Sequence, residues 1–193
     1  RQMCIRDRFP DYPVLLTRSL DEMRSYLRDR SHEDRRVGLL ASSQARRLRA
    51  FGLATADALQ GGTDWPKWFV EPATDIRSSS VLEVAASEFK CQGLEIDLAG
   101  LCWGDDYVWS EEHSRWTGRR IVGNKWNTDA DITHARNRYR VLLTRARYGL
   151  VIWVPKPLGH ELLVSSANAD ANTSALLRAG AKWLTPVLGA DAG

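Results

Sequence analysis

Two short segments of this 193-residue sequence carry residue types suited to phosphate chemistry. The first runs from Ser87 to Asp97 and has the sequence SEFKCQGLEID. Gly93 permits close approach of a ligand to the backbone, and Gln92 and Glu95 can hydrogen-bond a sugar hydroxyl or a phosphate-bound water. The segment lies between two predicted buried strands, which puts it at a sheet edge, where α/β folds place ligands. The alternative is a plain connection between strands with a polar surface.

The second segment is an arginine-rich helix candidate, NRYRVLLTRAR, at positions 137–147. Arg138 and Arg145 are seven residues apart, so on a helix they lie nearly in line beside an apolar stripe. A guanidinium held beside a buried stripe stays charged and preorganised, which suits it to stabilise a transferring phosphoryl group. A solvated basic face is the favoured interpretation for the other arginines here, Arg136, Arg140 and Arg147.

The elements that must position these residues alternate between short apolar runs and helical patterns. Buried strands are predicted at four places, each rich in Val, Leu, Ile or Ala without polar alternation: 37–41, 81–86, 98–104 and 150–154. Such runs are typical of a mainly parallel sheet with helices on both faces, so the predicted fold class is α/β.

Helices are predicted from apolar spacing and capping signals. The clearest spans 128–147, where five apolar residues recur at helical spacing: Ile132, Ala135, Tyr139, Leu142 and Ala146. An earlier amphipathic helix carries Leu20, Met23 and Leu27 on one face, and Ser19 with Glu22 forms its capping box. Two further short helices are predicted at 42–53 and 173–179. A loop is predicted at 61–68 and a surface hairpin at 109–125.

Composition sets limits on the function. Hydrophobic residues make up 44% and charged residues 26%, as in ordinary soluble domains, and the net charge of +3 requires any nucleic-acid binding to come from local basic strips. Eight tryptophans are present, and burial is favoured over a stacking role for most of them. The three cysteines form no CxxC pair, so neither a metal site nor a disulfide framework is predicted, which favours a cytoplasmic protein. No apolar run approaches the ~20 residues that a membrane span needs.

The first residues have an unusual origin. RQMCIRD corresponds to one reading frame of a transposon-type sequencing adapter. We therefore expect residues 1–8 to be non-native and the true upstream sequence to be missing. The alternative is a genuine polar N-terminal arm.

A family resemblance rests on both segments together. QGLEID resembles motif V of superfamily 1 helicases, VLLTRAR resembles their motif VI, and VGLLASSQARRL (37–48) resembles motif IV. The wider pattern of EFKCQGLEID, GLCWG and NRYRVLLTRAR is similar to a bacterial family with a Schlafen-type DNA/RNA helicase domain, long catalogued as a domain of unknown function. The resemblance implies a RecA-like P-loop NTPase second domain at 37–157. A helical or linker segment is predicted before it, at 9–36, and a helical tail after it, at 158–193.

The resemblance also implies roles for individual residues. Arg145 corresponds to the motif VI arginine that reaches the γ-phosphate, and Glu95 corresponds to the motif V acid that holds the ribose. Gln92 and Gly93 correspond to the turn that couples the nucleotide state to the nucleic-acid track. Arg138 is grouped with this nucleotide-binding set. Nucleic-acid contacts are expected from Ser87, Lys90 and Arg46. Two positions depart from the family pattern: Phe89 replaces a frequent His, and Ser42 stands where many members carry Arg, for which Arg46 is the candidate substitute.

The sequence contains no G-x-x-x-x-G-K-[ST] motif and no Asp-Glu Walker B strand. We therefore expect ATP and Mg²⁺ to be held mainly by an N-terminal RecA-like domain of the parent chain, and this fragment to be inactive alone. The expected function is the C-terminal half of an ATP-dependent helicase or translocase acting on single-stranded DNA or RNA. The alternatives are a nucleic-acid-dependent ATPase switch and a non-catalytic nucleic-acid-binding module.

Overall fold

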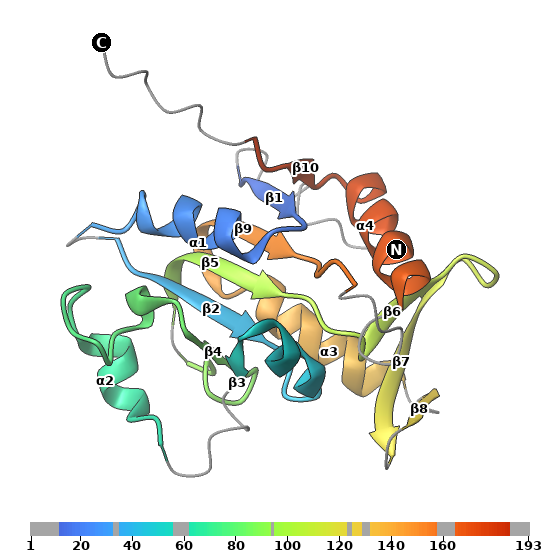
Figure 1. The fold of residues 1–193 in the computed structure, drawn as a ribbon, viewed down its shortest axis with the longest axis horizontal. Coiled ribbons are helices and arrows are strands. Elements are labelled where there is room, and N and C mark those ends of the chain that lie inside the picture. Colours follow the sequence, from blue (N-terminus) through green and yellow to red (C-terminus); the bar gives the residue numbers. More distant parts are fainter. Residues whose placement is uncertain are drawn as a thin grey trace.

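A seven-stranded parallel sheet forms the centre of the molecule (Figure 1). The computed structural model describes residues 12–32, 35–55, 62–93, 95–122, 125–128, 132–157 and 165–185. The strand order is β10-β1-β9-β5-β2-β4-β3, and each described pairing within this sheet is parallel. The strands are β1 (Val14–Thr17), β2 (Val37–Ala41), β3 (Ala54–Thr55), β4 (Val84–Ala86), β5 (Ile96–Cys102), β9 (Ala146–Trp153) and β10 (Lys182–Trp183). The predicted α/β class with a mainly parallel sheet is confirmed.

Helices cover both faces of the sheet and build two apolar cores. On one face, α1 (Leu20–Arg28) inserts Met23 and Leu27 into a cluster with β2 and β5 side chains. On the other face, α3 (Ile132–Leu143) contributes Ala135, Tyr139 and Leu142 to a second cluster, which α4 (Ser166–Arg178) extends. Burial on both faces explains why the central strands are apolar without alternation.

The predicted capping and helix ends are only partly reproduced. The Ser19 hydroxyl accepts from the Glu22 backbone N–H at 3.3 Å, which confirms the N-terminal signal of α1. Helix α3 ends at Leu143, earlier than predicted, because Ala146 opens β9 and pairs with β5. Pairing with a central strand overrides the helical spacing of the last predicted residue.

A three-stranded antiparallel sheet, made of two consecutive hairpins, stands beside the main sheet. Its strands are β6 (Tyr107–Ser110), β7 (Arg115–Val122) and β8 (Lys125–Thr128), in the order β6-β7-β8. The predicted surface hairpin is therefore confirmed. Trp116 of β7 stacks on Tyr107 with ring centroids 5.0 Å apart and lies 5.2 Å from the buried Trp103, so aromatic packing holds the base of the hairpin. Figure 1 shows β7 extending along one side of the domain to β8.

Several elements differ from the sequence prediction. Strand β1 falls in the segment expected to be a helical linker, and it pairs with β9 and β10 inside the same sheet. A four-residue strand in a charged segment gives little local signal, and its burial comes from its neighbours. Helix α2 (Trp65–Val70) replaces part of the predicted 61–68 loop, because Pro66 occupies the first turn and Asp64 caps it. The predicted 42–53 helix is the short 3-10 helix η2 (Arg46–Phe51).

Among the described residues, no helix is both long enough and apolar enough to cross a membrane.

Candidate functional site

Segment 87–97 connects the side of the sheet formed by the carboxyl ends of the strands, here called the carboxyl edge, to the side formed by their amino ends, the amino edge. Ser87 directly follows the carboxyl end of β4, whereas Glu95 directly precedes the amino end of β5. A helical turn begins between them, in which the backbone N–H groups of Lys90 and Cys91 both donate to the carbonyl of Ser87 at 3.0 Å. Because β4 and β5 both run parallel to β2, the two ends of the segment lie at opposite edges of the sheet.

Glu95 and Arg145 lie at the amino ends of two neighbouring strands. Ile96 of β5 is opposite Ala146 of β9, and its backbone N–H donates to the carbonyl of Arg145 at 3.2 Å. The structure therefore brings these two predicted site residues to one edge. This is the amino edge, and not the carboxyl edge at which α/β folds usually place ligands.

Arg145 is only partly exposed and lies close to the helical turn. Its charge acts on the buried thiol of Cys91: burial raises the pKa of Cys91 to about 11, and the nearby guanidinium of Arg145 opposes that rise. The Nε atom of Arg145 is shielded from solvent and has no hydrogen-bond partner in the described part of the chain. A buried guanidinium donor without an acceptor is costly unless a ligand supplies one.

The residues of the turn that follow Cys91 are open to solvent. Gln92 and Gly93 are both exposed, and Gly93 has a φ of +77°. A Cβ added at Gly93 would meet no atom within 4 Å, so the left-handed backbone and not close packing requires glycine there. The next described residue, Glu95, is 68% exposed and forms an ion pair with Arg147 at 3.4 Å. Arg147, predicted only as part of a solvated face, is therefore the cation nearest to this carboxylate in the described residues.

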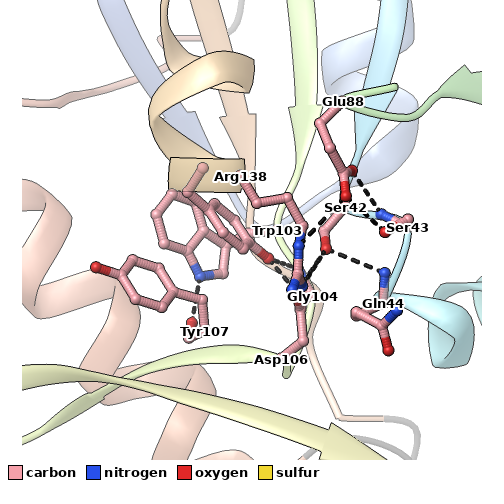
Figure 2. A network of polar contacts seen from close by, with 10 residues as sticks. Ser42, Ser43, Gln44, Glu88, Trp103, Gly104, Asp106, Tyr107 and Arg138 are labelled. Atoms are coloured by element: carbon pink, nitrogen blue, oxygen red, sulfur yellow. Dashed lines mark hydrogen bonds and ion pairs between the residues drawn. The ribbon is translucent and has the colours of Figure 1, made fainter. Parts of the chain in front are cut away.

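A buried polar network occupies the opposite, carboxyl edge (Figure 2). Asp106, fully buried after β5, accepts from the Ser42 hydroxyl at 2.6 Å and from Nη1 of Arg138 at 2.8 Å. Its second oxygen accepts from the Tyr139 hydroxyl at 2.8 Å, and that hydroxyl accepts from the Gly104 N–H at 3.2 Å. Burial raises the pKa of Asp106, while these partners oppose the rise.

Glu88 extends the network to the start of segment 87–97. Its carboxylate accepts from the backbone N–H and the hydroxyl of Ser43 at 2.9 and 2.6 Å. It also lies 3.3 Å from Nε of Arg138, so one guanidinium joins two buried carboxylates. The network thus ties together the residues that follow β2, β4 and β5, and it anchors the carboxyl-edge end of the segment (Figure 2).

Arg138 is held inside this network and is not brought together with Arg145. Its side chain is only 13% exposed, in the middle of α3. Arg145 lies two residues past the end of that helix at Leu143, next to the amino end of β9. Arg138 also donates to the Ser42 hydroxyl at 3.1 Å, whereas Arg46, the expected substitute for a missing arginine at that position, is exposed on η2. The nucleotide contact predicted for Arg138 stays a prediction.

Sequence reasoning missed Ser42, Glu88 and Asp106 as members of one site. A usable signal was present, because each follows a predicted apolar strand by one or two residues. The carboxyl ends of parallel strands share an edge, so polar residues in those positions converge when the strands are neighbours. The strand order, with β2 between β4 and β5, supplies the missing condition.

The predicted nucleic-acid contacts lie in different environments. Ser87 is 1% exposed, and its hydroxyl has no hydrogen-bond partner among the described residues. Lys90 is exposed, with Nζ 6.0 Å from the ring centroid of Trp65, and neighbouring Phe89 is 64% exposed. Arg46 is exposed on η2. No group of three or more metal-binding side chains gathers anywhere in the residues that the structure describes.

Comparison with known families adds one finding. A family model described as Schlafen group 3, DNA/RNA helicase domain, matches residues 5–156. The match covers both motif-bearing segments and every strand of the main sheet except β10. No curated protein and no solved structure matches the chain.

Proposed function

Because the chain belongs to the Schlafen group 3 DNA/RNA helicase domain family, we propose that it is the second RecA-like domain of an ATP-dependent helicase or translocase. In this proposal, ATP binds between another domain, which supplies the phosphate-binding loop, and the amino edge of this sheet. The observation that carries the proposal is the placement of Glu95 and Arg145 at the amino ends of adjacent strands, joined by the Ile96–Arg145 backbone hydrogen bond of 3.2 Å.

Arg145 is proposed to stabilise the transferring γ-phosphoryl group. It lies between the end of α3 and the start of β9, so two packed elements fix its backbone. Its Nε donor is shielded from solvent and has no hydrogen-bond partner within the described ranges of the chain, which favours an anion as its ligand. An arginine in this role adds ~10³ to 10⁵ to the rate of a site that already holds ATP and Mg²⁺.

Glu95 is proposed to accept a hydrogen bond from a ribose hydroxyl. Its present partner is Arg147, and both side chains are more than half exposed, at 68% and 53%. Exposed ion pairs of this kind contribute at most about 1 kcal/mol, so a ligand can replace the pair at little cost. Mg²⁺ is assigned to the domain that carries the phosphate-binding loop.

Segment 87–97 is proposed to couple the nucleotide to the nucleic acid. Gln92 and Gly93 face solvent near Glu95, whereas Ser87 lies at the other edge of the sheet. Arg138 and Ser43 hold Glu88 in place, so the other end of the segment, near the nucleotide, can move relative to a fixed end. ATP hydrolysis would then let the two domains separate and change the contacts of this domain with the single strand.

The experiment compares ATPase activity of full-length protein carrying Arg145→Ala with the unmodified protein, in the presence of single-stranded oligonucleotide. We expect kcat to fall by about 10³ or more, because the transition-state charge loses a stabilising guanidinium. Arg140→Ala is the matched control, since Arg140 is exposed on α3, the helix that precedes Arg145, and should change kcat less than twofold. Full activity of Arg145→Ala would remove the proposed role.

Strand displacement separates a motor from an ATPase switch. The exposed basic residues Lys90 and Arg46 support contact with nucleic acid in either case. A motor separates a duplex with a single-stranded overhang in an ATP-dependent way, whereas a switch hydrolyses ATP without separating it. A non-catalytic module shows neither activity and binds oligonucleotide independently of ATP.

A further inference from the structure

Helix α4 contacts the three-stranded sheet mainly through polar groups. Oδ1 of Asn172, a residue that is 1% exposed, accepts from the backbone N–H of Trp109 at 2.7 Å. Nη2 of Arg178 donates to Oε1 of Glu111 at 3.0 Å, and its guanidinium lies 5.5 Å from the ring centroid of Trp109. Figure 1 shows α4 beside β6, on the side of the domain where the three-stranded sheet stands.

The Asn172 side chain takes the place of a further strand at the outer edge of β6. In the described part of the chain, β6 is the end strand of the order β6-β7-β8, so β7 pairs with one of its two edges. On the other edge, the N–H of Trp109 donates to Asn172, and the carbonyl of Tyr107 accepts from Nε1 of Trp103 at 2.8 Å. Alternate residues of an antiparallel strand direct their backbone groups to the same edge, which is why positions 107 and 109 share it. If α4 moved away, the N–H of Trp109 would lose its acceptor.

The composition of α4 makes it a weak helix by itself. Six of its thirteen residues have short polar side chains that compete with the helix for backbone hydrogen bonds: Ser166, Asn168, Asp170, Asn172, Thr173 and Ser174. Its buried apolar side chains are those of Ala169, Ala175 and Leu176, whereas α3 buries Tyr139 and Leu142. Because α4 buries little apolar area, its polar contacts decide whether it stays docked.

Further polar contacts hold the start and the middle of α4. Nη1 of Arg18, which follows β1, lies 2.8 Å from Oδ1 of Asp170. Asp105, which follows β5, is hydrogen-bonded to the backbone of Ser165 at the start of the helix. Asp170 is 68% exposed and Arg178 is 55% exposed, so the ion pairs of both residues are open to water and weak.

We propose that α4 is a detachable strap that holds the three-stranded sheet in place. When docked, the strap covers the outer edge of β6 through Asn172. When it detaches, the N–H of Trp109 is left unpaired, and the three-stranded sheet is held mainly at its base, where Trp116 packs against Trp103. Such a local opening needs less free energy than global unfolding, because the strands of the main sheet stay paired.

The strap also reaches the buried network at the carboxyl edge. Asp105 contacts α4 and lies 4.0 Å from Nη1 of Arg119 in β7. The next residue, Asp106, accepts from the backbone N–H of Arg119 at 2.8 Å through its carbonyl and from Arg138 through its carboxylate. Detachment of α4 should therefore loosen β7 near Arg119 before it disturbs the main sheet. The family match ends at residue 156, so α4 lies outside the matched region.

The test is hydrogen–deuterium exchange of the full-length protein, followed by mass spectrometry of peptides from α4, β7 and β5. Strand β7 is the readout because it lies on the opposite side of β6 from Asn172. In the unmodified protein, α4 should exchange at least about tenfold faster than β5. Asn172→Val removes the acceptor of the Trp109 N–H and should accelerate exchange in both α4 and β7 by about tenfold, with β5 unchanged.

A matched control lies on the exposed face of the same helix. Ser174→Val introduces the same residue at an exposed position, and valine has about the same helix propensity as serine and asparagine. Exchange in α4 and β7 should therefore stay within about twofold of the unmodified protein in this variant.

A second variant leaves every buried residue of α4 in place. Asp170→Asn combined with Arg178→Gln removes both exposed ion pairs and should accelerate exchange in α4 and β7 severalfold. This variant carries the test if Asn172→Val unfolds the whole domain, which faster exchange in β5 would reveal. Unchanged exchange of β7 in both variants would overturn the proposal, as would an α4 that exchanges as slowly as β5 in the unmodified protein. The assay contains neither nucleotide nor nucleic acid, so its outcome does not depend on the proposed helicase function.

Discussion

The two edges of the central sheet use arginine in opposite ways. At the carboxyl edge, Arg138 is 13% exposed and lies between the carboxylates of Glu88 and Asp106. At the amino edge, the Nε donor of Arg145 has no acceptor among the described residues, and Glu95 is 68% exposed. Buried charged groups that already pair with each other stabilise the fold, whereas a hydrogen-bond donor without an acceptor can bind a ligand. The buried network at the carboxyl edge is structural, and the nucleotide contact that we propose lies at the amino edge.

Replacing Arg138 should give the largest loss of stability. Arg138→Ala leaves Glu88 and Asp106 buried without a cation, which costs about 3–5 kcal/mol for a buried pair. Urea unfolding followed by circular dichroism measures the free energy of unfolding. Arg140→Ala, on the exposed side of the same helix, is the control and should change it by no more than about 0.5 kcal/mol. A loss below 1 kcal/mol in Arg138→Ala would mean that the carboxyl edge is not structural.

Cys91 lies between the two edges and should make stability depend on pH. Burial raises the pKa of its thiol to about 11 from 9.0, so between these values the unfolded chain releases a proton that the folded chain keeps. Stability therefore falls as the pH rises from 9 to 11, by on the order of 2 kcal/mol. Cys91→Ala should flatten this decline, as measured by urea unfolding at pH 8, 9, 10 and 11. An identical decline in both proteins would place the thiol in a solvated environment.

Gly93 and Gly52 form a matched pair that separates backbone strain from function. Both have a left-handed backbone, with φ of +77° and +76°, and both have open space around an added Cβ. Alanine at either position should cost about 1 kcal/mol of stability, because an L-residue is strained there. Only Gly93→Ala should also lower the ATPase activity of the full-length protein. Equal activity of the two variants would argue against a role for the turn.

Glu95→Gln should have the smallest effect on stability. The Glu95–Arg147 pair is exposed, so the free energy of unfolding should change by less than about 0.5 kcal/mol. If the carboxylate holds the ribose, the KM for ATP should nonetheless rise severalfold in the full-length protein. A large loss of stability with an unchanged KM would reverse the roles assigned to the two edges.

Much of the fold was predictable because it depends on local patterns. The apolar run at 37–41 predicted a buried strand. The helical spacing of Ala135, Tyr139 and Leu142 predicted a packed helix, since apolar side chains are the ones that are buried on folding. Strand β1 escaped detection because four residues carry too little periodic signal. The start of β9 at Ala146 was also missed, because strand pairing there overrides helical spacing.

The sequence by itself determined the α/β class, the main apolar elements and the two segments whose residues suit phosphate chemistry. Only the tertiary structure decided which of these residues become neighbours, because that depends on the strand order β9-β5-β2-β4, which is not encoded in any single window. It placed Arg138 between buried carboxylates and left Arg145 near an exposed turn, although both belong to the segment 137–147. It also brought Arg47 of η2 to the ring of Trp126 in β8, a residue about 80 positions further along the chain.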